Sequence, residues 1–258
     1  MLMKSMSLKK DSAIKAALVV VCALVISVVL YAGLVRNDAE PVPSSSVSLD
    51  FSALPDGDLP GDFADGAPAT NSNDHVPPAS RMRIVDGAMT FAPTEPGTVA
   101  GYLSTPDLLS PVTGMRAKWV FRPGKGTMGA IALVVSKGIK ADQFPPLTPP
   151  ISIHLVVTPV NWNLAVQNPS QDQGLQYVGQ GFLKAELETD GKTEYDVGVR
   201  IDQGTATIDL PDGTSATVKD PRISQWRGNF ATFEIFANHG STDANGAFRE
   251  IWAASGDS

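Results

Sequence analysis

Cysteine is nearly absent from the sequence: among 258 residues only Cys22 is one. The chain beyond residue 22 therefore cannot be held together by an internal disulfide. Its stability has to come from a hydrophobic core, which a segment of roughly two hundred residues is long enough to build. With 43% hydrophobic and 18% charged residues, the composition is that of a globular protein rather than a disordered one.

Positive charge is scarce in most of the chain. The formal net charge is −7, and the first fifteen residues hold four lysines against one aspartate, so the remainder is more acidic still. Binding to a phosphate backbone requires a basic face, and the acidic body excludes nucleic acid as the expected partner. Glycine and proline are frequent, with 23 and 20 residues, which favours many turns over long helices.

Motifs of common catalytic and metal sites are also missing. The sequence contains no Gly-x-Ser-x-Gly and no His-Glu-x-x-His pattern. His75, His154 and His239 are far apart, without the spacing of metal ligands. His154 lies within the apolar stretch "ISIHLVV", where we expect a hydrogen-bonded inward histidine or an exposed one rather than a ligand.

One glycine motif does suggest a cofactor, because Gly124-x-Gly126-x-x-Gly129 has the spacing of dinucleotide-binding loops. Such a loop joins a buried strand to a helix that receives the pyrophosphate. Here the following segment, "AIALVVSKG", is short and rich in strand-forming residues, which predicts a strand. A phosphate-binding loop fails as well, because the required Gly-Lys-Ser/Thr order is absent. We interpret residues 122–129 as a hairpin loop and expect no nucleotide cofactor.

An uncharged apolar run occupies residues 16–35, interrupted only by Ser27. About twenty helical residues match the thickness of a bilayer core, and four lysines precede the run, so the N-terminus is expected in the cytoplasm. We predict a cytoplasmic tail over 1–15, a transmembrane helix in contact with membrane lipid over 16–35, a Pro/Ser-rich linker over 36–47, and an extracytoplasmic domain over 48–258. A cleaved signal peptide remains an alternative, although its apolar region is normally only about 7–15 residues. Lipidation of Cys22 is a second one, although no small residue precedes that cysteine.

Short β-rich runs separated by turn residues fill the rest of the chain. "RMRIV" and "AMTFA" flank Asp86-Gly87, which is typical of a tight hairpin turn. Residues 195–219 predict a three-strand meander, and residues 175–187 predict one strand with a glycine bulge or two strands. The pattern favours an all-β, two-sheet antiparallel sandwich without long helices. Further strands are predicted at residues 115–121, 130–135, 151–157, 162–166, 231–236 and 247–253.

Three phrases of the sequence resemble the concanavalin A-like lectin/glucanase superfamily: "LDFSALPDGDLPGDFADG", "GTVAGYLSTPDL" and "GVRIDQGTATIDLPDGTSATVKDPRI". The resemblance covers about residues 47–258 and consists of turns and strand patterns rather than reactive residues. It implies a jelly-roll sandwich, a fold that serves sugar binders, glycan hydrolases and adhesion modules alike.

A glucanase of this superfamily would carry its carboxylates on one face of a strand, as Glu-x-Asp-x-x-Glu or a variant one residue longer. The nearest match is Glu188, Asp190 and Glu194 in "ETDGKTE", where Asp190-Gly191 favours a hairpin turn instead. Glu186 and Glu188, expected on the same face of a strand, are the alternative catalytic pair.

Sugar binders often stack an aromatic ring on the apolar face of a sugar, with amides at the ring's edge. Trp119 and Trp252 alternate with apolar residues, so we expect both in the core. The other two tryptophans have polar neighbours, asparagines in "VNWNLAV" and Gln-Trp-Arg in "SQWRGN". The candidate ligand-binding residues are Asn161, Trp162, Asn163, Tyr177 and Trp226.

Calcium is a possible ligand because four aspartates lie close together in "PDGDLPGDFADG", and calcium prefers several oxygen ligands. Aspartate beside glycine or proline is equally typical of turns without a metal. The candidate calcium ligands are Asp56, Asp58, Asp62 and Asp65, with residues 241–247 as a weaker second site.

Taken together, the sequence favours a membrane-anchored, non-catalytic module that binds a cell-envelope polysaccharide or a neighbouring membrane protein. A glycan hydrolase and a structural scaffold without a small ligand are the alternatives.

Overall fold

The computed structural model describes residues 45–76, 78, 81–91, 99–123, 129–139, 149, 151–168, 173–237 and 245–256. The predicted cytoplasmic tail and transmembrane helix, and residues 36–44 of the predicted linker, lie outside this part of the chain. Within it, no helix is long and apolar enough to cross a membrane. The first strand begins at Ser46, so the last residues of the predicted linker belong to the domain.

Sheet 1 contains eight antiparallel strands in the order β13-β12-β11-β6-β15-β4-β3, with β1 pairing alongside β15. The first and last strands of the domain therefore lie next to each other. The strands are β1 (Ser46–Asp50), β3 (Met82–Ile84), β4 (Met89–Phe91), β6 (Val112–Arg122), β11 (Glu194–Asp202), β12 (Thr205–Asp209), β13 (Ser215–Lys219) and β15 (Asn245–Ser255).

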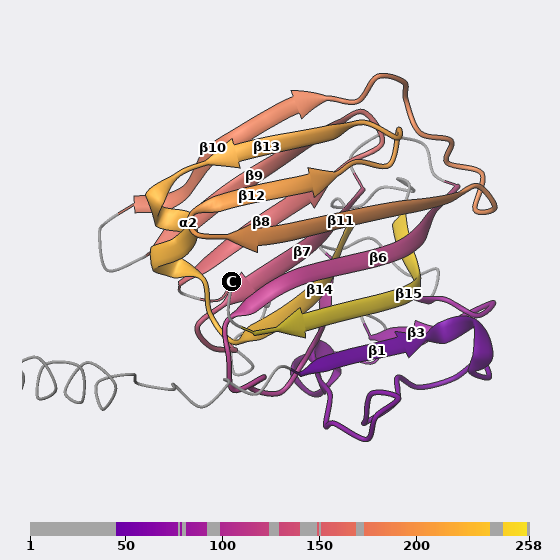
Figure 1. The fold of residues 1–258 in the computed structure, drawn as a ribbon. Coiled ribbons are helices and arrows are strands. Elements are labelled where there is room, and N and C mark those ends of the chain that lie inside the picture. Colours follow the sequence, from indigo (N-terminus) through magenta and orange to yellow (C-terminus); the bar gives the residue numbers. More distant parts are fainter. Residues whose placement is uncertain are drawn as a thin grey trace, which may run out of the picture. The chain divides into compact units, whose positions relative to one another are not determined.

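Sheet 2 contains seven antiparallel strands in the order β10-β9-β8-β7-β14-β5-β2. Figure 1 shows the two sheets as stacked layers, with β13, β12, β11, β6 and β15 in front of β10, β9, β8, β7 and β14. The all-β, two-sheet antiparallel sandwich expected from the sequence is confirmed. The strands of sheet 2 are β2 (Thr70–Asn71), β5 (Val99–Ser104), β7 (Ala130–Ser136), β8 (Ser152–Val157), β9 (Asn161–Asn168), β10 (Gln173–Phe182) and β14 (Phe230–Ala237).

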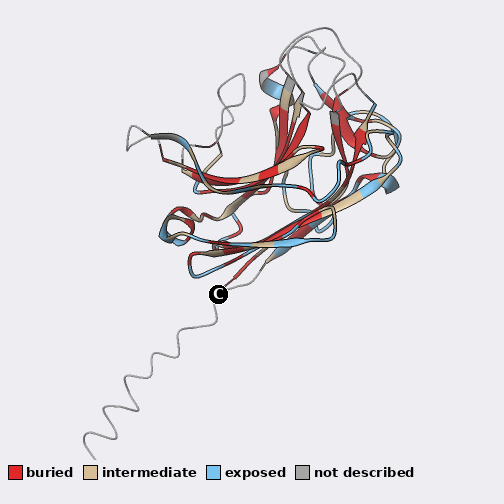
Figure 2. Ribbon diagram, turned by 90° about the horizontal axis from the view of Figure 1, so that it is seen from above, coloured by how far each residue is buried: buried red, intermediate tan, exposed pale blue. Residues whose placement is uncertain are grey.

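The hydrophobic core lies between the sheets, because alternate residues of each strand point inward. Phe233 of β14 and Phe248 of β15 meet edge to face across the two sheets, with ring centroids 6.1 Å apart. Trp119 is fully buried in the same core, as expected. In Figure 2 the buried residues run along the strands of both layers. The described helical structure is limited to α2 (Pro221–Trp226) and two short 3-10 turns, at Phe51–Ala53 and Ser72–His75.

The turn between β3 and β4 has the geometry that Asp-Gly predicts. Asp86 and Gly87 have φ values of 53° and 66°, and Val85 and Ala88 exchange both backbone hydrogen bonds. Such a two-residue turn with positive φ at both positions matches the twist of the flanking strands. The predicted three-strand meander is likewise confirmed as β11, β12 and β13.

Two predicted hairpins are wrong, because each connection crosses from one sheet to the other. The segment after β6 leads from sheet 1 to β7 in sheet 2, and its residues 124–128 lie outside the described chain. A strand, not a helix, follows Gly129, as the sequence predicted. The turn at Asp190-Gly191 is real, with a φ of 74° at Gly191, but it links β10 of sheet 2 to β11 of sheet 1.

Candidate ligand-binding site

Four of the five predicted ligand-binding residues lie together where β9 and β10 pair at the edge of sheet 2. Phe182 is opposite Asn161, Gln180 is opposite Asn163, and Tyr177 pairs with the residue two positions further along β9. Directly paired residues of neighbouring strands share one face of a sheet. The side chains of Asn161, Asn163, Tyr177, Gln180 and Phe182 therefore stand on the outer face of sheet 2, away from the core.

A β-bulge in β10 makes this arrangement possible. The register shifts between Tyr177 and Gly179, so Tyr177 and Gln180, three residues apart, can share one face. The bulged form of this strand was one of the two alternatives that the sequence left open, and the strand ends at Phe182.

The two glycines that follow the bulge occupy inward positions without room for a side chain. A Cβ atom on Gly179 would lie 2.5 Å from Cγ2 of Val218, and one on Gly181 would lie 2.9 Å from Nε1 of Trp162. The backbone of β10 can therefore lie close to the core, with its remaining side chains directed outward.

A hollow of about 480 Å³ opens at this position. Tyr177 and Phe182 stand beside it and are 60% and 85% exposed, which is unusual for large aromatic side chains in a strand. The volume is within the range of small-molecule sites. The hollow is lined by Asn161, Trp162, Asn163, Tyr177, Gln180, Gly181 and Phe182.

Amide groups provide the polar part of the hollow. Oδ1 of Asn161 accepts a hydrogen bond from the Thr158 hydroxyl at 2.9 Å, which fixes its side chain. Oδ1 of Asn163 is buried and has no hydrogen-bond partner in the described part of the chain. A buried acceptor without a partner costs free energy.

Neither candidate tryptophan presents a free ring. Trp162 is 8% exposed and packs in the core on the inner side of Gly181, while Trp226 of α2 is 3% exposed. The exposed indoles expected from their polar neighbours are therefore not found. The exposed rings belong to Tyr177 and to Phe182, which sequence reasoning missed. The sequence signal for Phe182 was the alternation of side chains in "QYVGQGF". This alternation indicates an outward Phe182 only when the bulge between Tyr177 and Gly179 is taken into account.

The four candidate calcium ligands do not converge. Oδ1 of Asp56 accepts the backbone N–H of Asp86 at 2.9 Å, and Oδ1 of Asp65 accepts that of Ala67 at 3.1 Å. Among the described residues, no three His, Cys, Asp or Glu side chains could hold a metal ion, so Asp58 and Asp62 complete no site either. Asp65 thus closes a local turn, and Asp56 connects its loop to the hairpin turn at Asp86-Gly87. Residues 241–244 of the second candidate lie outside the described chain.

The carboxylate pairs considered for a hydrolase are not assembled on a strand. Glu186 and Glu188 lie in the irregular segment after β10, where both are exposed and flank the buried Leu187. Asp190 accepts backbone hydrogen bonds from Lys192 and Thr193 within its turn. The strand geometry that would direct these acids into one cleft is therefore absent at these positions.

Two buried ionisable groups lie on the outer face of sheet 2. Burial raises the pKa of Glu234 from 4.5 to about 8, and its strand neighbours Tyr102 and Ala132 offer no second carboxylate. Burial lowers the pKa of His154 to about 4. Because Ser152 donates its hydroxyl hydrogen to Pro149, it accepts from Nε2–H of His154 at 2.8 Å. His154 is thus hydrogen-bonded and buried as expected, but it lies on the outer face of the sheet rather than inward.

No protein-family model matches the sequence, and no curated protein matches it either. The fold does resemble solved structures. The CBM2 module of the evolved Dit of Lactobacillus casei BL23 phage J-1 matches 84% of this chain and 99% of its own, with a TM-score of 0.54 and 12% identity. The Emp47p carbohydrate recognition domain matches 86% of this chain and 100% of its own, with a TM-score of 0.52 and 12% identity.

A legume lectin-like domain from Entamoeba histolytica matches 71% of this chain and 88% of its own, with a TM-score of 0.50 and 9% identity. At such low identities these matches establish the fold alone. The domain shares the jelly-roll sandwich fold of these structures, which the resemblance implied.

Proposed function

We propose that the sandwich is a non-catalytic module that binds a neutral glycan of the cell envelope in the hollow between β9 and β10. The observation that carries the proposal is the placement of Tyr177 and Phe182 on one outer face, exposed, beside a row of amide side chains. Rings of this kind pack against the C–H face of a sugar, and amides donate to and accept from its hydroxyl groups.

Several other features support this function. The acidic protein would repel an anionic polymer, whereas amides bind a neutral one without ionic partners. Two of the similar structures are named as a carbohydrate recognition domain and a legume lectin-like domain. The absence of a carboxylate pair at the positions considered favours binding over hydrolysis.

We also propose that the module is held on the outer side of the cell membrane by a helix over residues 16–35. The proposal rests on the length of that apolar run and on the lysines before it. A module tethered by a short linker would reach envelope polymers close to the membrane.

The test is a binding screen of the detergent-purified full chain against neutral envelope polysaccharides and an oligosaccharide array. We expect Tyr177→Ala and Phe182→Ala each to weaken binding about tenfold, since one stacked ring contributes about 1–1.5 kcal/mol. Leu109→Ala is the matched control, because Leu109 is an exposed apolar residue far along the chain from the hollow. EDTA should leave binding unchanged.

Three results would contradict the proposal. Undiminished binding by the Tyr177→Ala/Phe182→Ala double variant would place the site elsewhere. Release of reducing ends from the bound polymer would reveal a hydrolase. Absence of any glycan binding, together with co-purification of one membrane protein that the double variant no longer retains, would identify a protein partner.

A further inference from the structure

Trp252 lies on the outer face of sheet 1, although its apolar neighbours predict a core position. It is 39% exposed, whereas the other three tryptophans of the chain are buried. An exposed indole on such a face is available as a stacking surface for a ligand. This face is opposite to the one that carries the hollow of β9 and β10.

Small residues leave the space around this indole open. The benzo ring of Trp252 lies over Gly114 of β6, where an added Cβ atom would come within 3.2 Å of Cζ3. Ser48 pairs directly with Trp252, and Ala254 pairs with Gly114, so both neighbours are short. A flat ligand can therefore approach the ring without displacing tall side chains on that side.

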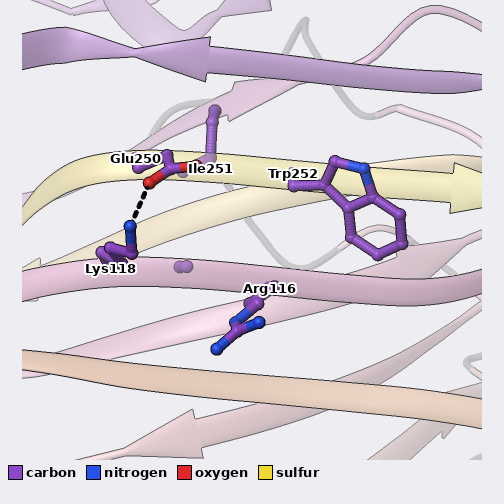
Figure 3. Close-up of a pocket in the computed structure, with 6 residues that line it drawn as sticks. Arg116, Lys118, Glu250, Ile251 and Trp252 are labelled. Atoms are coloured by element: carbon purple, nitrogen blue, oxygen red, sulfur yellow. Dashed lines mark hydrogen bonds and ion pairs between the residues drawn. The ribbon is translucent and has the colours of Figure 1, made fainter.

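Fixed charged groups border the other side of the indole (Figure 3). Arg116, directly opposite Trp252, holds Asp196 through two hydrogen bonds of 2.7 and 2.6 Å. Lys118 binds Glu250 at 2.6 Å. The two cations and two anions cancel, and a hollow of about 230 Å³ lies between them and the ring.

We infer that Trp252, Arg116 and the Lys118–Glu250 pair form a second saccharide subsite, which takes a neutral sugar ring. The exposed indole provides a stacking surface, and the paired side chains offer donors and acceptors for hydroxyl groups. The balanced charge favours a neutral sugar over an anionic one. This inference rests on the proposed function and extends it, because sites on opposite faces let one module bind two glycan chains.

Tryptophan fluorescence tests this subsite separately from the hollow of β9 and β10. Acrylamide quenches exposed indoles, so Trp252 should provide most of the quenchable emission. We expect neutral hexasaccharides of glucose, mannose or N-acetylglucosamine, added to the full chain, to reduce quenching at least twofold. In the Trp252→Phe variant, the affinity measured by calorimetry should stay within about threefold of the wild-type value, since the variant keeps an aromatic ring. Trp252→Ala should lose binding at this subsite.

Arg116→Met provides a second measurement that does not remove the fluorophore. It keeps most of the aliphatic stem but loses the guanidinium, and we expect at least a fivefold loss of affinity with unchanged emission. The Tyr177→Ala/Phe182→Ala double variant is the matched control and should keep the full fluorescence response. Far-ultraviolet dichroism and thermal midpoints confirm that each variant is folded.

The possible failures are distinguishable. If glycans bind at Tyr177 and Phe182 but never protect Trp252, the second subsite is wrong and the proposed function stands. If no sugar binds at either place, both fail. If Trp252 becomes protected with rising protein concentration and no sugar, a second copy of the chain covers this face, and the saccharide subsite is overturned.

Discussion

Glu234 is a buried carboxylic acid within the sandwich. The residue is 5% exposed, and its Oε2 has no partner in the described part of the chain. A charged carboxylate in such a place loses its hydration without a cation to replace it, so the neutral form is favoured. That preference has a direct consequence for stability at different pH values.

Stability should fall as the pH rises past Glu234's unfolded pKa. Burial raises its folded pKa to about 8, so between about pH 4.5 and 8 the folded state holds a proton that the unfolded state has lost. The stabilisation is complete below the lower value and is lost as the pH rises through the upper one. Glu234→Gln, which stays neutral, should flatten this decline in the thermal midpoint between pH 5 and 8. The exposed Glu186→Gln is the control, and an unchanged slope in Glu234→Gln would disprove the assignment.

At the scale of elements, β10 combines a site with a packing constraint. Its outward side chains line the candidate hollow, while Gly179 faces β13 of the opposite sheet. A side chain at position 179 would have to push Val218 or shift β10 itself. Binding at the hollow and packing between the two edge strands are therefore linked through the same backbone.

Gly179→Ala should destabilise the domain by about 1–3 kcal/mol, the usual cost of overpacking a core. The measurement is urea unfolding at equilibrium, with glycan affinity expected to fall in the same variant because β10 moves. Gly61→Ala is the matched control: no atom lies within 4 Å of its added Cβ, so its effect should stay within about 0.5 kcal/mol. Val218→Ala in the Gly179→Ala background should recover part of the loss. Independent, additive effects of the two changes would contradict the contact.

Local sequence signals predicted the elements better than the connections between them. Asp86-Gly87 identified its hairpin because the turn chemistry is contained in four residues. The loops after β6 and β10 contain equally good turn residues, but a turn does not show whether the next strand joins the same sheet. Trp252 was expected in the core because its immediate neighbours are apolar. It is in phase with Glu250, two residues earlier, and that alternation would have indicated the outer face.

For the whole molecule, the two faces of the sandwich differ in a way that composition could not reveal. The outer face of sheet 1 carries ion pairs and one exposed tryptophan, while that of sheet 2 carries buried Glu234 and His154 as well as the hollow at its edge. Sequence alternation separates inward from outward positions but does not tell which outward positions are covered. The sequence therefore identified the candidate residues by their amino-acid type alone, and only the structure shows which of them are exposed.

Orientation in the membrane is a property of the whole chain, and the positive-inside rule makes it testable. In bacterial spheroplasts, protease added outside should digest the body of the wild-type protein. Only detergent should extract the undigested protein from the membrane. Replacing Lys4, Lys9, Lys10 and Lys15 together by Gln removes the positive charges that, in the proposed orientation, favour a cytoplasmic N-terminus, so the digested fraction should fall. The control replaces four lysines of the body: Lys137, Lys184, Lys192 and Lys219. A protected body in the wild type, or its release by alkaline carbonate alone, would refute an anchor over residues 16–35.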